Sequence, residues 1–165
     1  MNAQTELYLR SIIFGISDSL VSTVGLLAGI DVAGTSRQTI LLTGIVYAFV
    51  EAFSMAVGSF LSEQSAEEYE VKGEAVGTGP FTAGVAMFVS FILASFIPIV
   101  PYLIFGLSTA LWCSVGFSLI ALFIVGMVSA KIVKVNILSN ALKMMLLGGA
   151  AIVIGVIVGK FVKVV

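Results

Sequence analysis

The sequence predicts an all-α integral membrane protein in which five transmembrane helices form a single domain over residues 1–165. Of these residues 59% are hydrophobic and 10% are charged, whereas a soluble domain carries about 25% charged residues. The mean hydropathy is +1.18. Residues 81–128 contain no charged side chain, and one crossing needs only about 20 residues. This stretch is therefore expected to cross the membrane twice.

Short polar segments and prolines delimit the expected helices. The second helix is expected to leave the membrane as a polar helix that runs to about Glu74, where VGTGP ends it. Pro98 and Pro101 are expected to divide the uncharged stretch, because proline lacks a backbone donor and clashes with the preceding helical turn. Lys131 to Asn140 reads as a polar connection. The expected spans are residues 9–30, 39–61, 81–97, 102–128 and 141–158.

The distribution of basic residues predicts an orientation. An odd number of crossings places the termini on opposite sides of the membrane. With a cytoplasmic N-terminus, five basic residues lie inside and three outside, which agrees with the positive-inside rule. The N-terminus lacks the basic start and cleavage site of a signal peptide, so the first helix is expected to be retained. We expect a cytoplasmic N-terminus, an external C-terminus and residence in the cell membrane of a prokaryote. The five inside residues are Arg10, Lys72, Lys131, Lys134 and Lys143.

Two carboxylates are expected near the middle of the bilayer. Asp18 lies roughly 14 Å into the first helix and Glu51 roughly 16 Å into the second, at about 1.5 Å per residue. A charge at this depth costs about 3 kcal/mol or more. An acid of this kind can be structural, bonded to nearby hydroxyls or capping a helix break. Two at matched depth with no basic partner instead indicate a site that holds protons or a divalent cation, which displaces protons from its ligands.

Further side chains share the faces of these two acids. Tyr47, Glu51 and Met55 are spaced one helical turn apart, Ser22 lies one turn after Asp18, and Ser54 adjoins Met55. Tyr and Met in a membrane helix also serve simply in packing. As a ligand, the Met55 thioether favours iron(II) or manganese(II) over magnesium or calcium, which prefer oxygen. Tyr47, Ser22 and Ser54 are therefore candidate pathway-lining residues.

An acidic face continues beyond the second span. It is either a solvated helix end or a cation-attracting cytoplasmic mouth. On a straight helix it points about a third of a turn away from the Glu51–Met55 face, so a continuous lane within one chain is not expected. Its four candidate metal ligands are Glu63, Glu67, Glu70 and Glu74.

Glycine spacing suggests sites of close helix packing. Gly25 and Gly29 form one GxxxG pattern, and Gly155 and Gly159 form another. Such patterns let membrane helices approach closely, although Gly is also simply frequent in these helices. No internal repeat is evident, so a symmetric pathway is expected to form between two chains.

Several functions are disfavoured by what the sequence lacks. There is no His and only one Cys, which removes the commonest zinc ligands and the usual nucleophile–base pairs. No phosphate-binding loop is present, so neither an enzyme nor ATP-driven transport by this chain is expected. No basic block suggests nucleic acid. The expected partners are membrane lipid, a second copy of the chain, protons and divalent metal, with no tightly bound cofactor.

The chain resembles the vacuolar iron transporter family over nearly its whole length. The matching segments include IIFGISDSLVSTVGLLAGI, TGIVYAFVEAFSMAVGSFLSEQSAEE, FVSFILASFIPIVPYL and LKMMLLGGAAIVIGVIVG. The resemblance implies a five-helix bundle and a homodimer with its pathway between protomers. It also implies export of iron(II), often manganese(II), from the cytosol in exchange for protons.

The resemblance also implies roles for particular residues. The family's transport acid falls on Asp18, its second-helix methionine on Met55 and the carboxylate of short members on Glu51. In some members an acid occupies the position of Tyr47. Two departures are visible: Asp18-Ser19-Leu20 replaces the usual Asp-Gly-Leu, and only about residues 63–79 stand where longer members insert a cytoplasmic metal-binding domain.

The predicted function is therefore proton-coupled export of iron(II) or manganese(II). Two other classes stay open at this point. One is a non-transporting membrane sensor or scaffold that acts through the acidic cytoplasmic helix. The other is a small-solute carrier that uses the buried acids for protons alone.

Overall fold

Five α-helices make up the part of the chain that the computed structural model describes, residues 3–71 and 77–162, and no strand occurs there. All five are long and apolar enough to cross a membrane. The predicted class, an all-α integral membrane protein, is confirmed. The helices are α1 (Ala3–Val32), α2 (Arg37–Val71), α3 (Gly79–Ile104), α4 (Leu107–Val133) and α5 (Ile137–Phe161).

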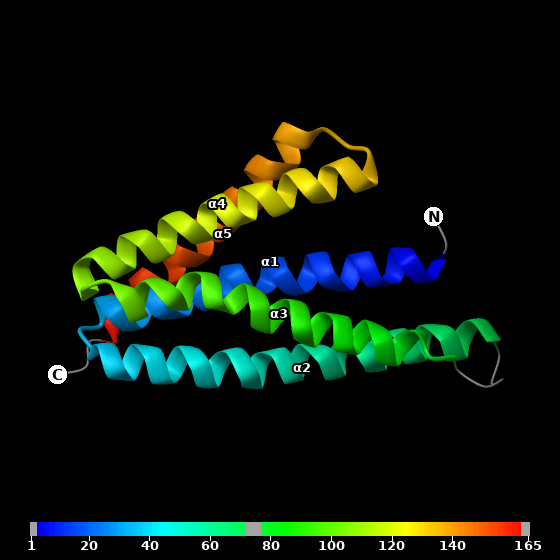
Figure 1. Ribbon diagram of the computed structural model, residues 1–165, viewed down its shortest axis with the longest axis horizontal. Coiled ribbons are helices and arrows are strands. Elements are labelled where there is room, and N and C mark those ends of the chain that lie inside the picture. The colour runs from blue at the N-terminus through cyan, green and yellow to red at the C-terminus, as the bar shows by residue number, and fades with distance from the viewer. Residues whose placement is uncertain (1–2, 72–76, 163–165) are drawn as a thin grey trace.

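Helix α1 is central to the bundle and packs mainly against α3 and α5 (Figure 1). Helix α3 also packs along α2, whereas α1 and α2 touch less extensively. Helices α4 and α5 form a hairpin on the other side of α1. The start of α1 and the acidic end of α2 lie at one end of the bundle, and the end of α5 lies at the other (Figure 1). Of the contacts that α1 makes with the other four helices, the contact with α2 is thus the least extensive.

The predicted break at Pro98 and Pro101 is wrong, because both prolines lie inside α3, which continues to Ile104. Each proline removes the hydrogen bond to the carbonyl four residues earlier and crowds that turn, and packing against neighbouring helices holds such a helix together in a membrane. Both prolines are fully buried, and Ser114 of α4 donates to the Pro98 carbonyl at 2.8 Å. The chain instead turns at extended Phe105 and Gly106, so α4 begins at residue 107 rather than 102.

The last two helices are joined by a shorter connection than the predicted one over residues 131–140. Helix α4 runs to Val133 and ends at Lys134, whose φ of 60° is left-handed. Helix α5 starts at Ile137, capped by the Asn136 side chain, which accepts from the Ser139 N–H at 3.0 Å. Such a cap satisfies one of the free N–H groups of the first turn. Local capping therefore sets this turn, which hydropathy alone did not predict.

The two GxxxG patterns pack against each other within one chain. A Cβ on Gly29 would lie 2.7 Å from the Gly155 carbonyl oxygen, and one on Gly25 would lie 3.1 Å from the Ala151 carbonyl oxygen. The backbones of α1 and α5 approach so closely that side chains are excluded between them, as small-residue patterns allow. We call this contact, formed by Gly25, Gly29, Ala151, Gly155 and Gly159, the glycine seam.

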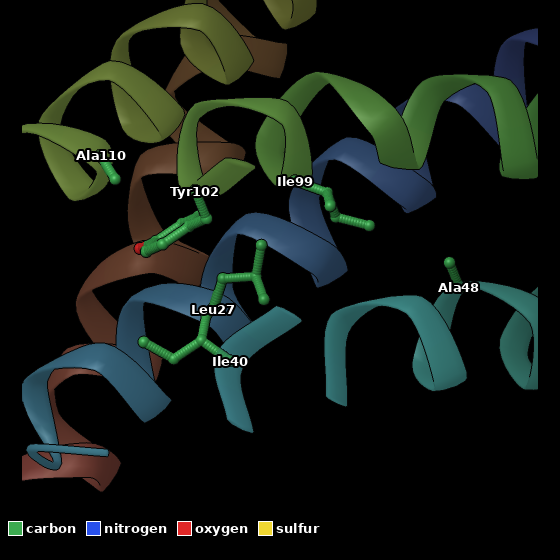
Figure 2. Packing of buried hydrophobic residues seen from close by; sticks show 6 residues of the cluster. All are labelled: Leu27, Ile40, Ala48, Ile99, Tyr102 and Ala110. Carbon is green, nitrogen blue, oxygen red and sulfur yellow. The ribbon is translucent and has the colours of Figure 1, made fainter. Parts of the chain in front are cut away.

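A buried hydrophobic cluster lies where α1 ends and α2 begins. Figure 2 shows that its side chains come from α1, α2, α3 and α4, with the Tyr102 ring among them. The Tyr102 hydroxyl donates to Asp31 Oδ2 at 3.0 Å, and Arg37 Nε donates to the Tyr102 carbonyl at 2.5 Å. A second Arg37 nitrogen donates to the Leu103 carbonyl. These contacts, here called the Arg37 clasp, tie α1, α2 and α3 together at this end.

Candidate functional site

The two predicted intramembrane acids lie close together across the α1–α2 contact. Asp18 lies midway along the apolar span Thr5–Val32, and Glu51 lies in the span Arg37–Tyr69. Both are half-buried, and their carboxylates are near enough to interact electrostatically. The arrangement follows from two straight helices that both rise about 1.5 Å per residue from opposite ends of one bundle. Two like charges therefore share one partly desolvated position.

Hydroxyl groups complete this cluster. The Ser22 hydroxyl donates to the Asp18 backbone carbonyl at 2.6 Å, and the Tyr47 side chain lies near it. Tyr47 in turn lies in the electrostatic field of both carboxylates. The basic residues of α1 and α2, Arg10 and Arg37, are at least two helical turns away along their own helices. We call Asp18, Ser22, Tyr47 and Glu51 the acid pair cluster.

The acid pair cluster has the chemistry to hold protons or a divalent cation. Two carboxylates in a low-dielectric site cannot both stay ionised without a counter-charge. Within residues 3–71 and 77–162, no three Asp, Glu, Cys or His side chains gather at one place. A cation here would therefore add hydroxyl or backbone oxygens to the two carboxylates, or take ligands from a second chain. The roles predicted for these residues stay predictions.

A polar cleft of about 660 Å³ opens between α1, α2 and α3 on the side of the acid pair cluster nearer the start of α1. Met55 lines it one turn beyond Glu51, and Phe14 lines it one turn before Asp18, so the cleft leads toward the acids. Predicted residues Ser54, Met55 and Glu63 all border it. Its full lining is Arg10, Ser11, Phe14, Ser54, Met55, Gly58, Ser59, Ser62, Glu63 and Met87.

The expected separation between the acidic face and the Met55 face does not hold for Glu63. Met55 and Glu63 border the same cleft, although they point in different directions from the α2 axis. The cleft is broad because α1 and α3 form its other walls, so it collects side chains from a wide sector of α2. Within one chain, the cleft therefore extends from Glu63 to Met55, which lies one helical turn from Glu51.

The acidic residues beyond Ser62 are partly engaged within the chain. Glu63 forms an ion pair with Arg10 of α1. Glu67 Oε1 accepts a hydrogen bond from the Gly77 N–H at 2.9 Å. Glu70 belongs to α2, but its side chain lies outside the described residues, as does the whole of Glu74. The predicted cation-gathering face therefore has fewer free carboxylates than the sequence count suggests.

Of the cleft residues that were not predicted as site residues, Arg10 and Met87 bring the side chains of α1 and α3 to the α2 wall. The sequence presents Arg10 only as an indicator of orientation, whereas in the structure it forms an ion pair with Glu63. Met87 comes from α3 and is buried at the back of the cleft. Neither position has a local signal, because each acquires its surroundings from other helices. The serines at 54, 59 and 62 recur along α2, and that recurrence is a sequence signal from which the polar wall could have been predicted.

Comparison with known proteins finds matches over most of the chain. The model of the VIT family matches residues 9–76 and 66–160. "Vacuolar iron transporter homolog 4" of Arabidopsis thaliana is 33% identical over 102 residues, covering 56% of this chain and 52% of that protein. "Vacuolar iron transporter homolog 3" of the same plant is 26% identical over 158 residues, covering 89% and 79%. An uncharacterised protein of Methanocaldococcus jannaschii is 24% identical over 154 residues, covering 82% and 80%. The chain thus spans about half of the first relative and about four fifths of the other two.

Proposed function

The chain belongs to the VIT family, and from this premise we propose that it exports a divalent metal, iron(II) or manganese(II), from the cytosol in exchange for protons. The observation that carries the proposal is the acid pair cluster. Asp18 and Glu51 lie near the middle of two apolar spans, within electrostatic reach of each other, and the basic residues of both helices lie turns away. A helix contact that served only stability would not need two such acids, because each of them costs several kcal/mol in a membrane.

Exchange follows from the charge balance at these acids. Two neighbouring anions in a partly desolvated site repel each other, so a positive charge bound between them stabilises the pair. A divalent cation requires ionised ligands and therefore releases protons as it binds. Asp18 and Glu51 bind protons and metal alternately, while Tyr47 and Ser22 supply further oxygen atoms as ligands of the metal. Metal moving one way and protons the other is the net result.

The oligomeric form belongs to the same proposal. A homodimer that brings two acid pair clusters together doubles the carboxylates available to one cation. It is supported by the limited α1–α2 contact and by the exposed apolar side chains along α2, such as Phe49 at 53% and Phe53 at 66% exposure. A two-fold axis is the commonest symmetry of such assemblies.

The test is metal flux into proteoliposomes under a pH gradient, with iron(II) and manganese(II) offered separately. We expect Asp18→Asn to abolish gradient-driven flux. An amide does not take up and release a proton as a carboxylate does, and it has no negative charge with which to bind the metal. Glu68→Gln serves as the matched control, since Glu68 is exposed and its side chain accepts a hydrogen bond from Gln64, one turn earlier in α2. Wild-type flux in Asp18→Asn would overturn the proposal, as would folded wild-type protein that moves neither metal.

A further inference from the structure

Two hydroxyl groups buried inside the helix bundle have no hydrogen-bond partner. Among the buried side-chain oxygen and nitrogen atoms of residues 3–71 and 77–162, they are Thr23 Oγ1 and Ser118 Oγ. Both side chains are 0% exposed. A buried hydroxyl that makes no hydrogen bond is costly, and ordered water commonly satisfies such groups in native proteins. By contrast, three other buried serines of the bundle donate to backbone carbonyls, namely Ser19, Ser95 and Ser114.

Thr23 of α1 lies level with Ser95 of α3. The Ser19 hydroxyl donates to the Phe91 carbonyl at 2.8 Å, which joins residues 72 positions apart. Further along the same two helices, a second hydrogen bond joins residues 71 positions apart. The two helices therefore run in the same direction with a nearly constant offset (Figure 1). Because Thr23 lies one turn beyond Ser19 and Ser95 lies one turn beyond Phe91, the two residues share one level of the bundle.

Ser118 reaches the same level from α4. It lies on the buried face of that helix, one turn after Ser114 and one turn before Leu122. Ser114 donates to the α3 backbone at 2.8 Å, and Leu122 packs in one buried cluster with Leu20 of α1 and Ala94 of α3. Because the residues on either side of it pack against these helices, the Ser118 side chain lies at the junction of α1, α3 and α4.

A carbonyl without its helical donor lies at the same junction. In a regular helix the Ala94 carbonyl accepts from the N–H of residue 98, but Pro98 has no N–H. Ala94 is 5% exposed and directly precedes Ser95, so its carbonyl is shielded from bulk water. Neither of the two buried hydroxyls donates to it directly, since neither has a partner. The junction therefore contains two donors and one acceptor that a bridging group can join.

We propose that one water molecule binds at this junction, where it accepts hydrogen bonds from Thr23 and Ser118 and donates one to the Ala94 carbonyl. Three hydrogen bonds are typical of a buried water. The water supplies the donor that Pro98 lacks, which is one way in which a membrane helix tolerates a proline. A metal cation suits the site less well, because it binds oxygen lone pairs and leaves the two hydroxyl hydrogens without an acceptor. The site supports the fold of α3 and is independent of the metal transport proposed above.

The sign of one substitution tests the site. Thr23→Val replaces the hydroxyl by a methyl group and leaves the shape of the side chain nearly unchanged. If the hydroxyl donates to a bound water, its loss should raise the equilibrium constant for unfolding about fivefold, the typical effect of one lost hydrogen bond. Reversible unfolding in mixed detergent, followed by circular dichroism, gives this constant. If the hydroxyl is unpaired, valine should instead lower the constant, because it removes a buried polar group that makes no bond. A lowered or unchanged constant would overturn the inference.

A second substitution tests whether the two hydroxyls share one water. Ser118→Ala is measured in the wild-type protein and in the Thr23→Val variant, so that the gain in helix propensity from alanine cancels between the two backgrounds. Because loss of the first hydroxyl already weakens binding of the water, the effect of Ser118→Ala on the unfolding constant should be at least about threefold smaller in the Thr23→Val background. Equal effects in the two backgrounds would show that no group bridges the two hydroxyls, and the proposal would fail.

Two controls identify the bound group and the cause of the change. Thr109→Val makes the same exchange at an exposed threonine of α4 and should change the unfolding constant by less than about twofold, as is usual for surface substitutions. The wild-type constant should also be the same in sodium chloride and in choline chloride of equal concentration. A constant that falls as sodium replaces choline would mean that the junction binds a cation, and would refute the water site.

Discussion

Substituting Gly29 by Ala tests whether the glycine seam holds the bundle together. The added Cβ would lie 2.7 Å from the Gly155 carbonyl oxygen and 3.1 Å from its carbonyl carbon. Carbon and oxygen in a relaxed contact stand about 3.3–3.6 Å apart, so the two helices must separate by roughly 0.6–0.9 Å. Both neighbouring atoms belong to backbone, and a side-chain rotation cannot relieve the clash. A gap of 0.5–1 Å forfeits about a quarter to a half of each dispersion contact along the seam.

Overpacking of this kind costs about 1–3 kcal/mol, and we expect Gly29→Ala to lower the free energy of unfolding by about 2 kcal/mol. Unfolding in mixed detergent, followed by circular dichroism, measures the difference. Gly149→Ala is the matched control, because a Cβ there meets nothing within 4 Å. It should be neutral, or stabilising by the greater helix propensity of Ala. Equal stabilities for the two variants would refute the close approach of α1 and α5.

Two further substitutions test other contacts of the fold. Tyr102→Phe removes the 3.0 Å bond to Asp31, and we expect a loss of about 1 kcal/mol in the same unfolding assay; an unchanged free energy would show that the bond is not made in the membrane. Asn136→Ala removes the cap of α5 and should also cost about 1 kcal/mol, with faster amide exchange at Ser139, and protection equal to wild type there would contradict the cap.

Membrane physics made the fold and the position of the acid pair predictable. The bilayer fixes the length of a crossing, so hydropathy located five helices. The same length scale placed Asp18 and Glu51 at one depth, and the structure brings them together. Pro98 and Pro101 misled because a proline's effect depends on its surroundings. In water they would end a helix, whereas here both are buried against neighbouring helices and lie inside α3.

The cleft was less predictable because three helices build it. Periodicity places Met55 and Glu63 on α2, but it does not tell which neighbour faces them. The Arg10–Glu63 pair joins residues 53 positions apart, and Met87 of α3 packs against α1 at Gly15, where an added Cβ would lie 3.1 Å from the Met87 sulfur. Contacts of this range depend on how the helices are arranged, which the sequence of any one helix does not specify.

The Arg37 clasp has a consequence for how easily that end of the bundle can open. Its two Arg37 bonds go to the carbonyls of Tyr102 and Leu103 in the last turn of α3, where a helix has no internal donors to offer. Water can replace a guanidinium at such carbonyls, so release exchanges one set of hydrogen bonds for another at a net of about 1 kcal/mol each. The glycine seam has no such substitute, since lipid and water cannot enter between touching backbones without separating them. Wetting therefore costs less at the clasp, where α1, α2 and α3 meet, than at the glycine seam between α1 and α5.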